Sequence, residues 1–202
     1  MLEAKNVVKT FDGFRALDGV SMTVPQGAVY GLVGPNGAGK STFLRLLSGK
    51  EEPDHGEISV KRGMSVAYLP QTPVLREDDT ITQAALDYLP ARQGEDPSSA
   101  AYEAQTILTQ LGFADLNQLV RELSGGQKMR VALAGALCRK SDVLLFDEPT
   151  SRLDALNEAI ILRSIHELSK SEQNADKGQD VAVVLVSHRE SAMRVADAVL
   201  NL

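Results

Sequence analysis

A glycine-rich segment that ends in a lysine and a serine is the first feature of this sequence that could do chemistry. It runs from Gly34 to Ser41 (GPNGAGKS) and fully matches the pattern G-x-x-x-x-G-K-[ST]. Glycines let backbone N–H groups close around phosphate oxygens, and a following helix points its positive dipole end at the anion. Lys40 would place a charge on the β- and γ-phosphates, and the Ser41 hydroxyl could bind Mg²⁺. The loop alone does not distinguish an ATPase from a kinase or a GTPase.

Two neighbouring carboxylates follow an apolar run, Val143-Leu-Leu-Phe146, that is typical of a buried strand. Ligands of open α/β sheets gather at the carboxyl ends of the strands. There Asp147 could hold Mg²⁺ through its water shell, while Glu148 could polarise an attacking water. A kinase would not need the glutamate, so Glu148 favours hydrolysis.

A second glycine-rich segment, Leu123-Ser-Gly-Gly-Gln127, precedes a helix that we expect to start near Gln127. Backbone donors at Ser124, Gly125 and Gly126, the serine hydroxyl and the helix N-terminus would form another anion-binding site. With this string the chain resembles the ABC ATPase family, and the family's other motifs occur in the expected order. The resemblance covers essentially the whole chain.

The resemblance implies roles for residues that would be unremarkable singly. Phe11 matches the aromatic that stacks on adenine, although Phe14 is nearby and tyrosine is commoner there. Gln71 matches the glutamine that senses Mg²⁺ and the attacking water, and His188 matches the histidine that contacts the γ-phosphate. Asp154 matches the loop that communicates across the dimer, in which Arg152 replaces a small residue. The nucleotide-contacting set implied by the resemblance is Phe11, Gly34, Pro35, Asn36, Gly37, Ala38, Gly39, Lys40, Ser41, Thr42, Ser124, Gly125, Gly126, Gln127 and Asp154; the metal set is Ser41, Gln71 and Asp147.

Each of these motifs occurs once, so one chain cannot complete a site if the second glycine-rich segment must cap a nucleotide held by another domain. The resemblance therefore implies a head-to-tail dimer with a second ABC ATPase domain, either a copy or a paralogue. Two ATP molecules, with Mg²⁺, would lie at its interface. Ser124 and Gly126 would contact the γ-phosphate of the partner's ATP.

The elements that position these residues indicate an α/β P-loop NTPase fold. Strands alternate with helices in the last third of the chain, which predicts a mostly parallel sheet flanked by helices. An antiparallel β part is expected near the N-terminus, where Val20, Met22 and Val24 alternate with polar residues. We divide the single domain into a nucleotide-binding core (1–71 and 140–202) and an inserted helical subdomain (about 72–139) that carries the second glycine-rich segment.

Composition limits the setting of this ATPase. The net charge of −6 argues weakly against a general nucleic-acid or anionic-membrane binder, and the single cysteine, Cys138, excludes an internal disulfide. No apolar run is long enough to span a bilayer and no signal peptide is visible. We expect a cytoplasmic protein, peripheral at the inner face of the membrane through a partner.

The sequence leaves three possible cellular roles for such an ATPase. The preferred interpretation is the ATP-binding subunit of an ABC transporter, docked on a transmembrane permease subunit through a groove lined by residues 72–80. The alternative is a protein related to the ABC-F class, which acts on the ribosome, although the chain has one cassette and no basic linker. A DNA-repair ATPase would need a long coiled-coil insertion, which the sequence lacks.

Overall fold

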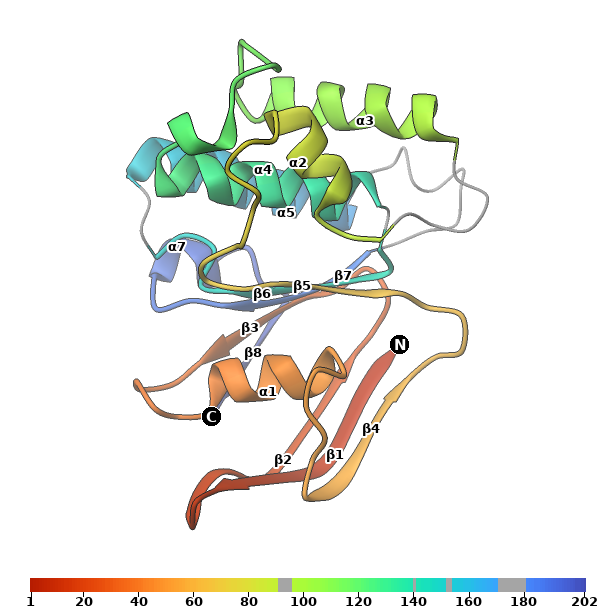
Figure 1. Cartoon of the computed structure of the whole chain (residues 1–202). Helices are drawn as coiled ribbons and strands as arrows, with labels where there is room; N and C mark the ends of the chain where they lie inside the picture. The colour runs from red at the N-terminus through yellow and green to blue at the C-terminus, as the bar shows by residue number, and fades with distance from the viewer. Residues whose placement is uncertain (91–95, 140, 152–153, 171–180) are drawn as a thin grey trace.

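The structure, a computed structural model, describes residues 1–202 except 91–95, 140, 152–153 and 171–180. At its centre lies a parallel sheet in the order β5-β6-β7-β3-β8 (Figure 1). Its strands are β3 (Val29–Val33), β5 (Val66–Leu69), β6 (Val143–Asp147), β7 (Ala182–Val186) and β8 (Ala198–Asn201). The strands β6 and β7 are buried at every position, as expected for apolar strands covered on both faces.

An antiparallel sheet in the order β2-β1-β4 lies beside the parallel one. It consists of β1 (Leu2–Phe11), β2 (Phe14–Val24) and β4 (His55–Val60). The alternation of Val20, Met22 and Val24 marked only the end of β2. Register shifts along the β1–β2 ladder disturb the strict alternation that would have marked β1 and the start of β2. The hairpin tip pairs Phe11 with Phe14, and both residues line a pocket with residues 36–42 of the glycine-rich loop.

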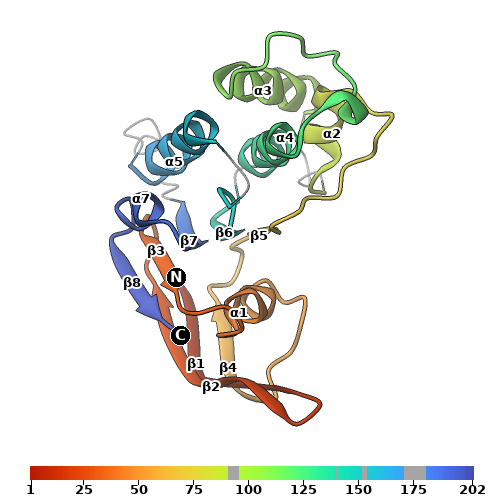
Figure 2. The same cartoon turned by 90° about the vertical axis from the view of Figure 1, so that its left-hand side faces the viewer.

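Helix α1 (Lys40–Leu47) lies between the two sheets (Figures 1 and 2). Its fully buried Phe43 and Leu44 join Leu2 of β1 and Val184 of β7 in one apolar cluster. Burial of this face against both sheets fixes the N-terminus of α1 at the carboxyl edge of the parallel sheet.

The opposite face of the parallel sheet is covered by helices (Figures 1 and 2). Between β5 and β6 the chain forms α2 (Ile81–Asp87), α3 (Pro97–Gln110), the 3₁₀ turn η1 (Val120–Glu122) and α4 (Gly125–Cys138). After β6 come α5 (Ala155–Lys170) and, beyond β7, the short α7 (Glu190–Met193). These helices share a second apolar core with Leu144 of β6 and Val183 of β7. The polar loop expected at 171–180 lies outside the described residues.

Helix α4 packs closely on α2. A Cβ at Gly135 would lie 2.5 Å from the Ala85 carbonyl oxygen and 2.6 Å from the Tyr88 Cβ. Only glycine therefore permits this approach of the two helices. Ala104, Leu108 and Leu111 have the spacing of an amphipathic helix, and they form one face of α3, with Ala104 and Leu108 buried and Leu111 at its C-cap. The helices α2, α3 and α4 are thus held together as a group, whereas their division from the core as a subdomain remains a prediction.

Helix α4 begins at Gly125, two residues earlier than the sequence indicated. The reason is a capping box: the Ser124 hydroxyl accepts a hydrogen bond from the Gln127 amide at 3.3 Å, and Gln127 Oε1 accepts one from the Ser124 amide at 2.8 Å. Both glycines therefore lie in the first helical turn. No helix among the described residues is long and apolar enough to cross a bilayer.

Candidate active site

The glycine-rich loop passes from β3 into α1 at the carboxyl edge of the parallel sheet. Lys40 begins the helix and is almost fully buried, and its ammonium group donates to the carbonyl oxygens of Gly34 at 2.7 Å and Pro35 at 2.9 Å. Gly39, the N-cap of α1, has a φ of 83°. A Cβ there would lie 2.3 Å from the Ala16 carbonyl oxygen. The loop thus requires glycine for both its conformation and its close packing on β2.

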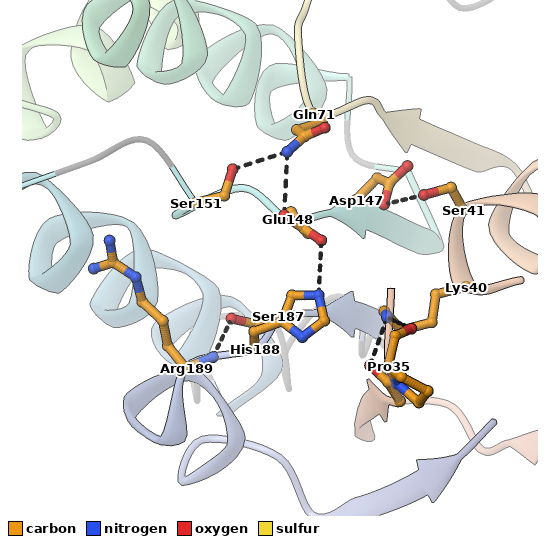
Figure 3. Close-up of polar contacts among 11 residues, drawn as sticks. Pro35, Lys40, Ser41, Gln71, Asp147, Glu148, Ser151, Ser187, His188 and Arg189 are labelled. Carbon is orange, nitrogen blue, oxygen red and sulfur yellow. Dashed lines mark hydrogen bonds and ion pairs between the residues drawn. The ribbon is translucent and has the colours of Figure 1, made fainter. Parts of the chain in front are cut away.

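Asp147 ends β6 beside this loop and is buried. One of its carboxylate oxygens accepts a hydrogen bond from Ser41 Oγ at 2.9 Å (Figure 3). The other accepts one from Tyr68 Oη at 3.0 Å. Burial and, next, the negative charge of Asp147 raise the pKa of Tyr68, which keeps its hydroxyl a donor. The sequence predicted Ser41 and Asp147 together, and the structure places them together.

Glu148 follows Asp147 and points to a different set of partners. Its oxygens lie 3.1 Å from Gln71 Nε2 and 3.1 Å from His188 Nε2 (Figure 3). Gln71 also donates to Ser151 Oγ at 3.3 Å. Three residues predicted from separate parts of the sequence, Gln71, Glu148 and His188, are therefore brought into one cluster. Gln71 contacts Glu148 here, so its predicted place in a metal site stays a prediction.

The backbone of Glu148 is strained. Its φ is 49°, a left-handed conformation that costs a non-glycine residue on the order of 1–3 kcal/mol. The Glu148 amide donates to Val186 of β7 at 3.1 Å, and its carbonyl accepts from the Ser151 amide at 3.1 Å. These bonds hold the strained turn and direct the carboxylate towards His188, while the preceding Asp147 side chain points to Ser41.

A pocket of about 500 Å³ lies over the glycine-rich loop. Besides residues 36–42 and Glu148, it is lined by Phe11, Phe14, Ala16 and Arg45. Phe11, predicted to stack on adenine, is 39% exposed and Phe14 is 65% exposed, so both rings are accessible to a planar ligand. Their placement at the rim leaves adenine stacking by Phe11 a prediction and makes Phe14 a second candidate.

The other predicted glycine-rich segment does not line this pocket. Ser124 and Gly125 are exposed at the start of α4, on the helical side of the sheet, whereas the glycine-rich loop lies beside α1 (Figure 1). The predicted Asp154 is also exposed, immediately before α5. Arg152, next to it, lies outside the described residues.

Sequence reasoning missed three contributors to the site: Tyr68, Ser151 and Arg45. Tyr68 lies on β5, shortly before Gln71 in the chain, and β5 pairs with β6. The strand order would therefore have indicated Tyr68 as a neighbour of Asp147. Ser151 lies in the segment Ser151-Arg-Leu-Asp154, of which only the end was assigned a role.

The residues present fit a magnesium nucleotide. Mg²⁺ is usually held by one or two carboxylate or hydroxyl oxygens together with substrate phosphates rather than by a complete protein cage. The buried Asp147 carboxylate and the adjoining Ser41 hydroxyl form such a hard-oxygen pair. No group of three or more His, Cys, Asp or Glu side chains among the described residues is placed to hold a metal.

A parallel sheet with a glycine-lysine loop after β3 at its carboxyl edge, and with an acidic pair at the end of β6, separated from β3 by β7, defines a P-loop NTPase. Comparison with known proteins places it more narrowly. The model of the ABC transporter family matches residues 17–151. The arginine transport ATP-binding protein ArtM of Bacillus subtilis is 33% identical, over 99% of this chain and 86% of the relative. The L-cystine transport system ATP-binding protein TcyN of Escherichia coli is 33% identical, over 97% and 84%.

A solved ATP-binding cassette agrees in three dimensions. It is described as a dimer in a post-hydrolysis state bound to ADP and Pi, and it superposes with a TM-score of 0.85 at 25% identity. The match covers 100% of this chain and 94% of the solved one. This chain belongs to the ABC transporter family and has the fold of its ATP-binding cassettes.

Proposed function

We propose that this chain is the ATP-binding and ATP-hydrolysing subunit of an ABC transporter and works as a head-to-tail dimer. The observation that carries the proposal is the Glu148 cluster. A carboxylate held by Gln71 and His188 stands beside, but separate from, the Ser41–Asp147 pair. Hydrolysis requires this separation, because one acid must serve the metal while another orients water.

Each residue then has a distinct task. Lys40 moves from the loop carbonyls to the β- and γ-phosphates, and the amides of residues 37–41 surround them. Ser41 and Asp147 would hold Mg²⁺, and the bound ion would supply positive charge to neutralise the phosphate oxygens. Glu148 orients the attacking water and His188 contacts the γ-phosphate. Gln71, which donates to Glu148, would sense Mg²⁺ and the attacking water.

The partner cassette supplies what the pocket lacks. The start of α4 is exposed and does not line the pocket of its own chain. In the proposed dimer Ser124, Gly125, Gly126 and Gln127 cover the γ-phosphate of the partner's ATP, and Asp154 lies near the same interface. The relative solved as a dimer with ADP and Pi supports this arrangement.

The transport task rests on the relatives, whose names assign them to arginine and L-cystine transport. We propose a transmembrane permease subunit as the further partner, which would place this chain at the cytoplasmic face of the membrane. The segment 72–80 would face the permease. This segment is tied to the helical group through ion pairs between Glu77 and Lys128 at 2.7 Å and between Asp78 and Arg121 at 3.1 Å. Val74, between Gln71 and these ion pairs, is 89% exposed.

The substitution Glu148→Gln tests the proposal. It keeps the hydrogen-bonding shape of the side chain but removes the charge that orients water, so turnover should fall about 100-fold or more while ATP still binds. ATP and Mg²⁺ should then trap a dimer, measured by light scattering after size exclusion. Glu57→Gln, an exposed acid on β4, is the matched control and should behave as wild type. A Glu148→Gln protein that hydrolyses ATP at the wild-type rate, or that binds ATP and stays monomeric, would contradict the proposal.

A further inference from the structure

Glu158 on α5 is a buried carboxylate that the proposed reaction does not use. It is 7% exposed, and both of its oxygens have partners. Oε2 accepts a hydrogen bond from Arg189 Nη1 and forms an ion pair with it. Oε1 accepts a hydrogen bond from the Ser191 hydroxyl. Burying a charge is costly unless it is paired and hydrogen-bonded. The buried Glu158 carboxylate therefore depends on Arg189 and Ser191 being held in these positions.

Both partners of Glu158, Arg189 and Ser191, closely follow His188, the proposed γ-phosphate contact, in the chain. His188 lies between Ser187 and Arg189, and buried Ser187 accepts a hydrogen bond from the Arg189 amide at 3.1 Å. His188 points to Glu148, whereas the Arg189 side chain leaves the loop on the other side, over α5 (Figure 3). The loop is therefore held from behind by Glu158 while its histidine faces the reacting centre.

The other end of Glu158 is tied to the loop before α5. Its amide donates to the Asp154 carbonyl at 3.0 Å in the first turn of the helix. Glu158 thus connects the segment that carries Asp154, proposed to lie at the dimer interface, with the segment that carries His188.

We propose that Glu158 is a positioning residue that fixes His188 on Glu148 through Arg189 and Ser191. This inference rests on the proposed function, because it assigns a purpose to the His188 contact. A displacement of His188 by about 1 Å is enough to cost up to about 100-fold in rate when geometry controls the reaction. A purely structural ion pair would instead lower stability without acting on His188 in particular.

Histidine NMR measures the position of His188 without any need for activity. The chain has three histidines, His55, His166 and His188, so their imidazole signals can be followed separately. Glu158→Gln removes the charge that holds Arg189. We expect the His188 signals to shift or broaden and those of His55 on β4 to stay unchanged. Ser164→Ala is the control on the same helix, because the Ser164 hydroxyl donates within α5, to the Ile160 carbonyl at 2.9 Å.

Steady-state kinetics then test whether the effect passes through His188. In Glu158→Gln we expect kcat to fall about tenfold or more and the KM for ATP to stay within about twofold, since the Lys40 loop is untouched. In a His188→Gln background the same change should produce no further loss, because the histidine that it positions is absent. Should Glu158→Gln fail to fold, Ser191→Ala removes one of the contacts and should give a smaller shift of the His188 signals.

Three results would overturn the inference: unchanged His188 signals in the folded variants, an equal loss of kcat with and without His188, or a general shift of all three histidines. A wild-type protein that hydrolyses no ATP would count against the proposed function instead, and the NMR comparison would still decide whether Glu158 holds His188.

Discussion

The glycine-rich loop before α1 and the glycine-rich segment before α4 have the same local plan but different surroundings. Each leads into a helix whose first amides face outwards. The N-cap of α1 is Gly39 in a left-handed conformation, and no side chain of the described residues caps this helix. The N-cap of α4 is Ser124 in an extended conformation, and a capping box with Gln127 satisfies it. The start of α1 therefore has no side-chain cap among the described residues, whereas the start of α4 is capped by its own Ser124 and Gln127.

The two sites also differ in how much of the fold they depend on. The loop before α1 is packed on β2 and connected to β5 and β6 through the Ser41–Asp147–Tyr68 chain of hydrogen bonds. Around Gly125, by contrast, an added Cβ would meet nothing within 4 Å. A site built inside one chain is sensitive to local packing. In the proposed dimer, the open space at Gly125 is filled by the partner.

The largest effect is expected for Gly39→Ala, which changes the glycine-rich loop where it packs on β2. The new methyl would clash with the Ala16 carbonyl and force a side chain into a left-handed conformation. We expect ATP affinity to fall about 100-fold, equivalent to about 2.7 kcal/mol, because the loop must shift. Fluorescent-nucleotide titration measures this. Normal ATP affinity in Gly39→Ala would show that the packing of the loop on β2 is not needed for binding.

Gly125→Ala should have the second largest effect, and of the opposite kind. It lies in the first helical turn with open space around it, so the protein should be as stable as wild type or more stable by about 0.5–1 kcal/mol. ATP should bind the monomer normally, but turnover should fall about tenfold because the partner's phosphate now meets a methyl group. Thermal unfolding, nucleotide titration and phosphate release separate these effects. Wild-type turnover in Gly125→Ala would contradict the proposal that the segment before α4 contacts the partner's ATP.

Tyr68→Phe tests whether the Tyr68 hydroxyl orients Asp147 beside the glycine-rich loop. The change removes the hydroxyl that donates to Asp147 at 3.0 Å, so the carboxylate is less well oriented for metal. We expect Mg²⁺ affinity in the presence of ATP to weaken about tenfold, as is common when a partner of a metal ligand is lost. Isothermal titration with Mg²⁺ provides the measurement. Tyr88→Phe, against α4, is the control and should leave the Mg²⁺ affinity unchanged.

The smallest effect concerns stability at alkaline pH. Burial raises the pKa of Tyr88 above its ordinary value of about 10 in the unfolded chain. The stabilisation from keeping Tyr88 neutral is therefore complete below about pH 10 and is lost as pH rises towards the folded pKa, by at most about 1.4 kcal/mol per pH unit. Urea unfolding of wild type and Tyr88→Phe between about pH 9 and pH 11 should show a shallower decline in the variant. Parallel declines would contradict this.

Much of the fold could be predicted because its central strands are apolar runs bounded by turns. The apolar runs at 28–33, 143–146 and 181–186 predict strands, and these correspond to β3, β6 and β7 within one residue at each end. Strand β1 was missed because its register shifts interrupt the alternation, and α2 and α7 are too short to show a helical period. The start of α4 was placed late because glycines weaken helix propensity, and the capping box of Ser124 and Gln127 outweighs them.

The sequence by itself predicted the chemistry, because three local patterns have residue types that are typical of particular ligands. The glycine-lysine loop and the second glycine-rich segment are typical of phosphate binding, and the acidic pair is typical of metal and water binding. Only the tertiary structure decided which side chains meet. It directed Asp147 to Ser41 and Tyr68 but Glu148 to Gln71 and His188, and it placed Glu158 behind the histidine. Such meetings depend on strand order and on a strained turn at Glu148, and neither is encoded in the spacing of residues along the chain.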